Sequence, residues 1–146
     1  MFNKGVKKYI FIDVENLPFL NCEVVWRVAI SYGYVICPVG YKNFVDSFIS
    51  KNNLKDMPEK FIKRIDCDIV GRNSTDLLIA CMIGVVYSNT TDAKTILLTM
   101  DKFGVVLKNV LLEQGITIDA PLDMSKNRLK KGAKNAYITK RIIESL

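Results

Sequence analysis

Short apolar runs that alternate with helix-like segments constrain this chain more than any other feature. The runs are three to five residues long and rich in branched and aromatic side chains, as in strands buried on both faces of a sheet. Strands that alternate with helices favour a parallel sheet with helices on both faces. The sequence therefore predicts an α/β fold, a Rossmann-like three-layer sandwich with a mostly parallel sheet of about five strands. The predicted strands are 9–12, 34–37, 67–70, 95–99 and 116–118, and the predicted helices between them are 22–31, 77–87 and 105–114.

Two parts of the chain follow this pattern less closely. Residues 40–64 are more polar, and their apolar residues predict two short amphipathic helices, one on each side of Pro58. Residues 137–146 carry isoleucines at helical spacing and predict one further helix. The length of 146 residues is that of one domain. We expect this domain to occupy residues 1–123, with residues 124–146 as a basic C-terminal tail.

The chain contains no histidine. A Ser/His/Asp triad, a Cys/His dyad, a paired-histidine ribonuclease mechanism and an HExxH zinc site are therefore excluded. The four cysteines form no CxxC pair and have apolar neighbours, so we expect reduced thiols in the core and no structural zinc. Any hydrolysis by this chain needs a nucleophile from another source.

Apolar stretches long enough for export or membrane insertion are absent from the sequence. The first apolar run, 9–12, is too short for a signal peptide. The longest run, 77–87, is too short to cross a bilayer. We therefore expect a cytoplasmic protein without membrane contact.

The net charge of +6 is concentrated at the C-terminal end. Residues 1–123 carry 14 basic and 14 acidic residues, whereas residues 124–146 carry seven basic residues and one acid. Such a cluster predicts contact with an anionic polymer, because each phosphate that a cation neutralises releases condensed counterions. A solvated basic terminus without a partner is the alternative. The residues that we assign to nucleic-acid binding in this segment are Lys126, Arg128, Lys130, Lys131 and Lys134.

Three aspartates follow predicted strands and would meet at one edge of the sheet. Asp13 ends the first strand, Asp76 lies in the first helical turn after the third, and Asp101 lies just past the fourth. Ligands of open α/β sheets gather at this carboxyl edge. Glu15 and Asn16 follow Asp13 in the same loop and add oxygen donors. The sequence therefore predicts a site for Mg²⁺ or Mn²⁺, because these ions prefer oxygen ligands.

A divalent ion would also supply the chemistry that the missing histidines cannot. Carboxylates brought together repel one another and raise each other's pKa unless a cation lies among them. A bound metal ion lowers the pKa of a water molecule and holds a phosphodiester for attack. For each aspartate taken singly, a structural role at a helix N-terminus is the alternative. Tyr41 follows the second predicted strand at the same edge and could contact nucleic acid there, but an ordinary loop position is the stronger explanation.

Three sequence blocks resemble signatures of the NYN and PIN-like ribonuclease superfamily. Residues 11–16, FIDVEN, resemble its opening Asp-x-x-Asn signature. Residues 72–80, RNSTDLLIA, resemble its K-N-x-x-D-x-x-I-A helix start. Residues 96–104, ILLTMDKFG, followed by QGI at 114–116, are similar to its S-x-D-x-x-F…G-I block. The resemblance covers residues 9–119, and the blocks have the order and spacing of the family.

The resemblance implies a PIN-like fold and endonucleolytic cleavage of RNA with Mg²⁺ or Mn²⁺. The carboxylates of Asp13, Asp76 and Asp101 would then hold the metal, with Asn16 supporting the first of them. Asn73 would orient ligands or phosphate. These roles follow from the family and not from the spacing of the residues.

One position departs from the family pattern. Family members often carry a further acid two to four residues beyond the position of Asp101, where this chain has apolar residues and a glycine at 103–105. Glu15 is one replacement for the missing ligand, and a single-ion site or a domain that binds RNA without cutting it are others. Lys102 would neutralise phosphate or stabilise an oxyanion, or it is an ordinary surface lysine.

The leading hypothesis from the sequence is thus a metal-dependent endoribonuclease. A catalytically degenerate PIN-like module that binds RNA or regulates a partner is the main alternative. A response-regulator receiver ranks last, because it requires adjacent acids after the first strand and a lysine after the last strand. Whether DNA is also a substrate and whether the chain forms a homodimer stay open at this stage.

Overall fold

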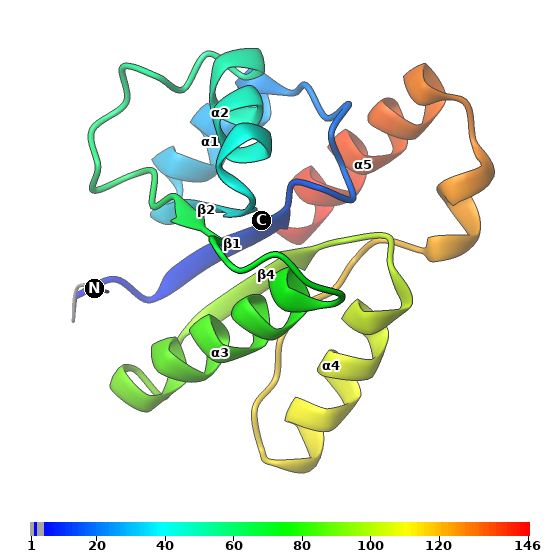
Figure 1. Cartoon of the computed structure of the whole chain (residues 1–146). Coiled ribbons are helices and arrows are strands. Elements are labelled where there is room, and N and C mark those ends of the chain that lie inside the picture. Colours follow the sequence, from blue (N-terminus) through cyan, green and yellow to red (C-terminus); the bar gives the residue numbers. More distant parts are fainter. Residues whose placement is uncertain (1, 3–4) are drawn as a thin grey trace.

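A computed structural model, which describes residues 2 and 5–146, has an α/β fold built on a parallel sheet (Figure 1). Four strands pair in the order β3-β2-β1-β4, and all three pairings are parallel. The α/β class and the parallel sheet are therefore confirmed. The strands are β1 (Lys8–Asp13), β2 (Tyr34–Gly40), β3 (Ile65–Asp66) and β4 (Lys94–Leu98).

Helices cover both faces of this sheet (Figure 1). Alternate residues of β1 point to opposite faces, so Ile10 and Ile12 enter one core cluster while Tyr9 and Phe11 enter the other. The first cluster lies under α1 (Glu23–Ser31), α2 (Lys42–Lys51) and α5 (Lys131–Ser145). The second lies under α3 (Ser74–Asn89) and α4 (Lys102–Glu113). A short 3-10 helix, η1 (Met124–Arg128), precedes α5.

The predicted fifth strand is wrong, because the sheet has four strands in the described part of the chain. Residues 116–118 form no strand, and the segment makes only one isolated parallel bridge, between Asp119 and Ile96 of β4. The amide of Leu97 donates to the Asp119 carbonyl at 2.7 Å. Pro121 follows two residues later, and a proline lacks the N–H group that a longer ladder needs.

The third strand lies earlier than predicted, at residues 65–66 instead of 67–70. It pairs only with the last residues of β2, Val39 and Gly40. Because β2 ends there, the residues that follow have no neighbouring strand. The side chains of Ile69 and Val70 are accordingly 75% and 88% exposed.

Residues 40–64 contain one helix, α2, where the sequence predicted two. Beyond Pro58 the chain runs beside β2 instead, with an isolated parallel bridge between Ile62 and Ile36. The Ile36 amide donates to the Phe61 carbonyl at 2.9 Å. The apolar residues that suggested a second helix therefore cover the edge of the sheet.

The predicted C-terminal helix is present and begins earlier than expected, at Lys131. Its buried residues Ile138 and Ile142 join the core cluster under α1 and α2. No helix within residues 2 and 5–146 is long and apolar enough to cross a lipid bilayer.

Helix α5 runs antiparallel to the strands. Near its start, the Asn135 side chain accepts from the Asn21 amide at 2.9 Å and donates to the Asn21 carbonyl at 3.0 Å, just before α1 begins. Near its end, the ammonium of Lys94, the first residue of β4, donates to the Ser145 carbonyl at 3.1 Å. The first turn of α5 and the basic residues around it therefore lie at the carboxyl edge of the sheet.

Candidate functional site

A polar hollow of about 270 Å³ lies at the carboxyl ends of the strands. Asp13 at the end of β1, Asp76 in the first turn of α3 and Asp101 at the start of α4 all line it. The structure thus places the three predicted aspartates around one space. The full lining consists of Asp13, Glu15, Asn16, Tyr41, Gly71, Asn73, Ser74, Thr75, Asp76 and Asp101.

Asp13 is the most buried of the lining carboxylates, with 4% of its surface exposed. Its Oδ2 accepts a hydrogen bond of 2.9 Å from the Thr99 hydroxyl, and the same hydroxyl oxygen accepts the Asp101 amide at 3.1 Å. The side-chain oxygen of Asn16 accepts the Met100 amide at 2.6 Å. These bonds fasten the loop after β1 to the segment between β4 and α4.

Glu15 connects its loop to two further segments. Its Oε2 accepts the Tyr41 amide at 2.8 Å and the Thr75 hydroxyl at 2.7 Å, so one oxygen connects the start of α2 with the start of α3. The side chain passes directly over Gly40, where an added Cβ would lie 2.9 Å from Oε2 and 2.7 Å from Val14 Cγ2. Glu15 therefore has a structural task that the sequence did not reveal, in addition to its predicted position among the acids.

The alternative explanation for Asp76 and Asp101 was a purely structural role as helix caps. Asp101 does occupy the N-cap position of α4, yet its side chain makes no capping hydrogen bond. The N-cap of α3 is Asn73, a non-glycine residue with a left-handed backbone (φ 65°), and Asp76 lies in the turn that follows. Capping therefore does not account for either carboxylate.

Burial and, to a smaller extent, mutual repulsion raise the pKa values of two aspartates in the hollow. The pKa of Asp13 is raised to about 6, mainly by burial and also by the charges of Asp76 and Glu15, against the opposing effect of the Thr99 hydrogen bond. Burial also raises the pKa of Asp76, and the charges of Asp101 and Glu15 add to this. A cation between these groups would stabilise their charged forms.

The positive ends of three helix dipoles oppose this accumulation of negative charge. The N-cap residues of α2, α3 and α4 are Tyr41, Asn73 and Asp101, and all three line the hollow. Helix N-termini attract anions, including phosphate groups. The hollow therefore combines oxygen donors for a cation with helix ends that suit an anion.

The carboxylate and amide oxygens that line the hollow are the kinds of ligand that a hard divalent cation usually binds. Within residues 2 and 5–146, however, no three acidic or cysteine side chains already converge into a group that could hold a metal ion. The carboxylates of Asp76 and Asp101 would have to approach that of Asp13 to share one ion.

The hydroxyl groups of Thr99, Thr75 and Ser74 were not predicted to belong to the site, whereas Tyr41 was expected at this edge of the sheet. Thr99 and Thr75 bond to Asp13 and Glu15, and the Tyr41 and Ser74 hydroxyl oxygens lie 3.2 Å apart at the rim. Thr99 carried a recognisable signal, since it is a polar residue in an otherwise apolar run two positions before Asp101. The other hydroxyls become visible only once α3 is placed beside β2.

Among the residues predicted to contact nucleic acid, Asn73 lines the hollow, while Lys102 is exposed one position after Asp101 and lies outside the lining. Lys134, in the first turn of α5, lies with its ammonium 5.2 Å from the centre of the Phe19 ring. Phe19 belongs to the loop that carries Glu15 and Asn16. The side chains of Lys126, Arg128, Lys130 and Lys131 are exposed along η1 and the start of α5.

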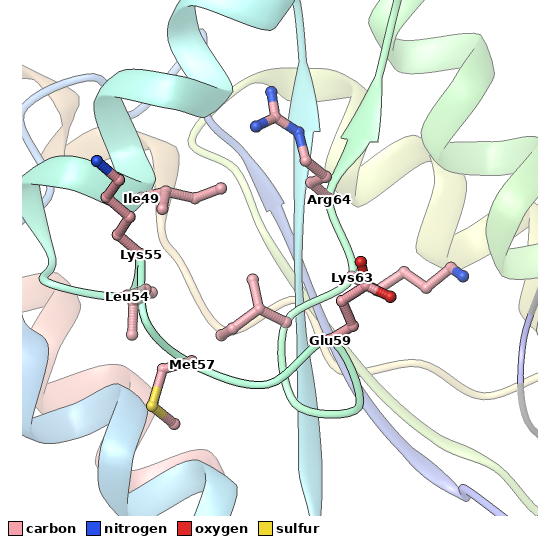
Figure 2. Close-up of a pocket in the computed structure, with 8 residues that line it drawn as sticks. Ile49, Leu54, Lys55, Met57, Glu59, Lys63 and Arg64 are labelled. Atoms are coloured by element: carbon pink, nitrogen blue, oxygen red, sulfur yellow. The ribbon is translucent and has the colours of Figure 1, made fainter.

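A second hollow of about 390 Å³ lies between α2 and residues 52–64 (Figure 2). It shares no lining residue with the acidic hollow. Leu54 and Met57 contribute apolar surface to it, and Arg64 is held by ion pairs to Asp46 and Asp66 at 2.8 and 3.0 Å. Its lining holds one acid and three cations, so it does not suit a divalent metal ion. The acidic hollow is therefore the stronger candidate for catalysis.

The fold and this site define an α/β protein with an acidic hollow at the carboxyl edge of a four-stranded parallel sheet. Comparisons with protein-family models, curated proteins and solved structures gave no match for the chain. Membership of the NYN and PIN-like superfamily therefore stays a prediction from the three sequence blocks.

Proposed function

We propose that this protein is a metal-dependent endoribonuclease of the PIN-like type. The observation that supports this most is the arrangement of Asp13, Asp76 and Asp101 around one hollow into which helix N-termini point. An acidic hollow alone would repel RNA, but the exposed basic residues of η1 and α5 lie at the same edge of the sheet. This combination suits a site that binds a cation first and a phosphodiester second.

In this proposal Asp13, Asp76 and Asp101 hold Mg²⁺ or Mn²⁺. The ion, when bound, activates a water molecule for attack on the phosphodiester and stabilises the negative charge that develops there. Thr99 keeps one oxygen of Asp13 in a fixed position, which leaves the other oxygen for the ion. Glu15 holds the starts of α2 and α3 in place, and its second oxygen is available as a further donor.

RNA would approach over the basic segment and place one phosphate in the hollow. The hydroxyl groups of Tyr41 and Ser74 and the side chain of Asn73 are the polar groups at the rim that suit phosphate oxygens. The exposed cations of Lys126, Arg128, Lys130 and Lys131, together with the half-buried Lys134, would neutralise neighbouring phosphates.

A labelled single-stranded RNA incubated with the protein and Mn²⁺ tests the proposal. We expect internal cleavage that EDTA stops and that Asp13→Asn and Asp101→Asn abolish. Asp92→Asn is the matched control, because Asp92 is exposed and pairs with Lys7 near the opposite edge of the sheet. Cleavage that survives the Asp13→Asn, Asp101→Asn double substitution would remove the assignment. A DNA strand of the same sequence, tested in parallel, decides whether the 2′-hydroxyl matters.

A second candidate function is RNA binding without cleavage. It is favoured by the absence of a ready-made metal group among the described residues and by the missing acid after Asp101. Gly104 in that stretch packs so closely that an added Cβ would lie 2.6 Å from Thr99 Cγ2. RNA affinity that EDTA leaves unchanged, together with intact RNA after prolonged incubation in Mn²⁺, would support this alternative.

A further inference from the structure

The loop between β1 and α1, residues 14–22, connects the acidic hollow with the start of α5 (Figure 1). Glu15 and Asn16, near the beginning of this loop, line the hollow. Asn21, near its end, bonds to the Asn135 side chain of α5 through both its amide and its carbonyl. An RNA strand that reaches from the basic residues of α5 to the hollow therefore runs along the middle of this loop.

Phe19 lies in the middle of the loop, three residues beyond Asn16. A chain spans at most about 3.6 Å per residue, so the Cα atoms of these two residues lie within about 11 Å of each other. The Phe19 side chain is half-buried against the first core cluster, and the Lys134 ammonium lies 5.2 Å from the centre of its ring. Because an apolar core does not accommodate a charged ammonium, Lys134 marks a ring face that is accessible from solvent.

A second cation reaches the same loop from a different helix. The ammonium of Lys51, the last residue of α2, donates to the Pro18 carbonyl at 2.6 Å. The Lys134 ammonium donates to the Asn127 side chain at 3.0 Å. Neither lysine forms an ion pair in the described part of the chain. Since an ammonium group has three N–H donors, both lysines can still donate to a phosphate oxygen.

We propose that Phe19, Lys51 and Lys134 form a subsite for one unpaired nucleotide of the bound RNA. The base stacks on the accessible face of the Phe19 ring, and the two ammonium groups neutralise the phosphates beside it. The Lys134 ammonium covers this face in the free protein and turns to a phosphate when the base arrives, because its four-carbon stem is flexible.

The inference rests on the proposed binding of RNA, with or without cleavage. It adds that the strand at the loop is unpaired, since the stacked bases of a duplex do not offer their faces to a protein side chain. The nucleotide that occupies the subsite lies close to the phosphate in the hollow, because the loop itself is short.

Position distinguishes Phe19 from a chemically similar pair elsewhere in the molecule. The Lys60 ammonium lies 5.0 Å from the centre of the half-buried Phe61 ring. Phe61 lies beside Ile36 in the first half of β2, and neither Phe61 nor Lys60 lines the acidic hollow. These two residues therefore provide matched controls for substitutions in the proposed subsite.

Fluorescence anisotropy of a short single-stranded RNA, measured in Ca²⁺ and in EDTA, tests the proposal without the Mn²⁺ used for cleavage. We expect Phe19→Leu to weaken binding by about fivefold or more, because stacking on an aromatic ring contributes to the affinity for each base. Phe19→Tyr should retain the affinity, and Phe61→Leu should leave it unchanged. Lys51→Ala should weaken binding more than Lys60→Ala, although each removes one charge. Circular dichroism verifies that the variants are folded.

A fluorescent base gives a readout that a purely structural role of Phe19 would not change. 2-Aminopurine loses fluorescence when it stacks on an aromatic ring, so the protein should quench it at the position that Phe19 binds. Phe19→Leu should remove this quenching even when the RNA is saturated with protein. Quenching that persists in Phe19→Leu, or a duplex of the same sequence that binds as tightly as the single strand, overturns the subsite. A wild-type protein that binds neither form of RNA contradicts the proposed function itself.

Discussion

The Thr99 hydroxyl and the Asp13 carboxylate form a buried hydrogen bond of 2.9 Å across 86 positions of the sequence. The same hydroxyl accepts the amide of Asp101. The orientation of one proposed metal ligand is thereby coupled to the backbone that carries another. This coupling can be tested without altering any acidic residue.

Replacing Thr99 with valine keeps the shape of the side chain and removes its hydroxyl. A hydrogen bond to a charged group contributes about 1.5 to 3 kcal/mol, so the free energy of unfolding should fall by that amount at pH 8. The pKa of Asp13 should rise further, because this bond lowers it. Urea unfolding at pH 8 measures the first effect. Thr95→Val is the control, since the buried Thr95 hydroxyl has no partner in the described structure and its loss should cost little.

Asp13 should make the metal-free protein less stable as the pH rises. Its pKa is about 6 in the folded state against an ordinary value of 3.8, mainly through burial and to a smaller extent through the charges of Asp76 and Glu15. The folded state therefore holds a proton that the unfolded state has released, and stability falls between about pH 4 and 6 by roughly 3 kcal/mol at most. Asp13→Asn should abolish this decline. Urea unfolding at pH 4.5 and 7.5 in EDTA measures the difference, and equal pH profiles for the two proteins would contradict the prediction.

Gly40→Ala should disturb the site through Glu15. The added Cβ would lie 2.7 Å from Val14 Cγ2 and 2.9 Å from Glu15 Oε2, so the glutamate must move and its bonds to Tyr41 and Thr75 are weakened. We expect a loss of about 1 to 3 kcal/mol in the free energy of unfolding. Thermal or urea unfolding measures it.

The control for this substitution is Gly132→Ala in the first turn of α5. An added Cβ there has no atom within 4 Å. Alanine favours helix by up to about 1 kcal/mol over glycine, so this variant should be as stable as the wild type or slightly more stable. A Gly40→Ala protein with wild-type stability and an unchanged Mn²⁺ affinity would show that Glu15 does not depend on this close approach.

The basic segment should set the salt dependence of RNA binding. Replacing Lys130 and Lys131 with alanine should weaken binding and lower the slope of log affinity against log salt by roughly 0.7 for each lost phosphate contact on a single strand. Fluorescence anisotropy at several salt concentrations provides the measurement. Lys55→Ala and Lys60→Ala, outside the α5 edge, should leave the slope unchanged. An equal effect of both pairs would show that the binding is non-specific attraction to the net charge.

The apolar runs by themselves determined the class of fold and the edge at which the three aspartates lie. Runs such as 9–12 and 95–99 mark strands because their pattern is local, and parallel strands place their carboxyl ends together. Asp13 and Asp101 follow two such strands directly. Their common position was therefore predictable without any knowledge of long-range contacts.

Only the tertiary structure decided which apolar runs pair as strands and which groups surround the three aspartates. Residues 67–70 look like a strand, yet β2 ends at Gly40 and leaves them without a partner. The direction of α5, which brings the basic residues to the carboxyl edge, is fixed by contacts such as that between Asn135 and Asn21. The pattern of neighbouring residues predicts whether a segment can form a strand or a helix. Which distant segment it pairs with depends on long-range contacts, and these cannot be deduced from the local pattern of a single sequence.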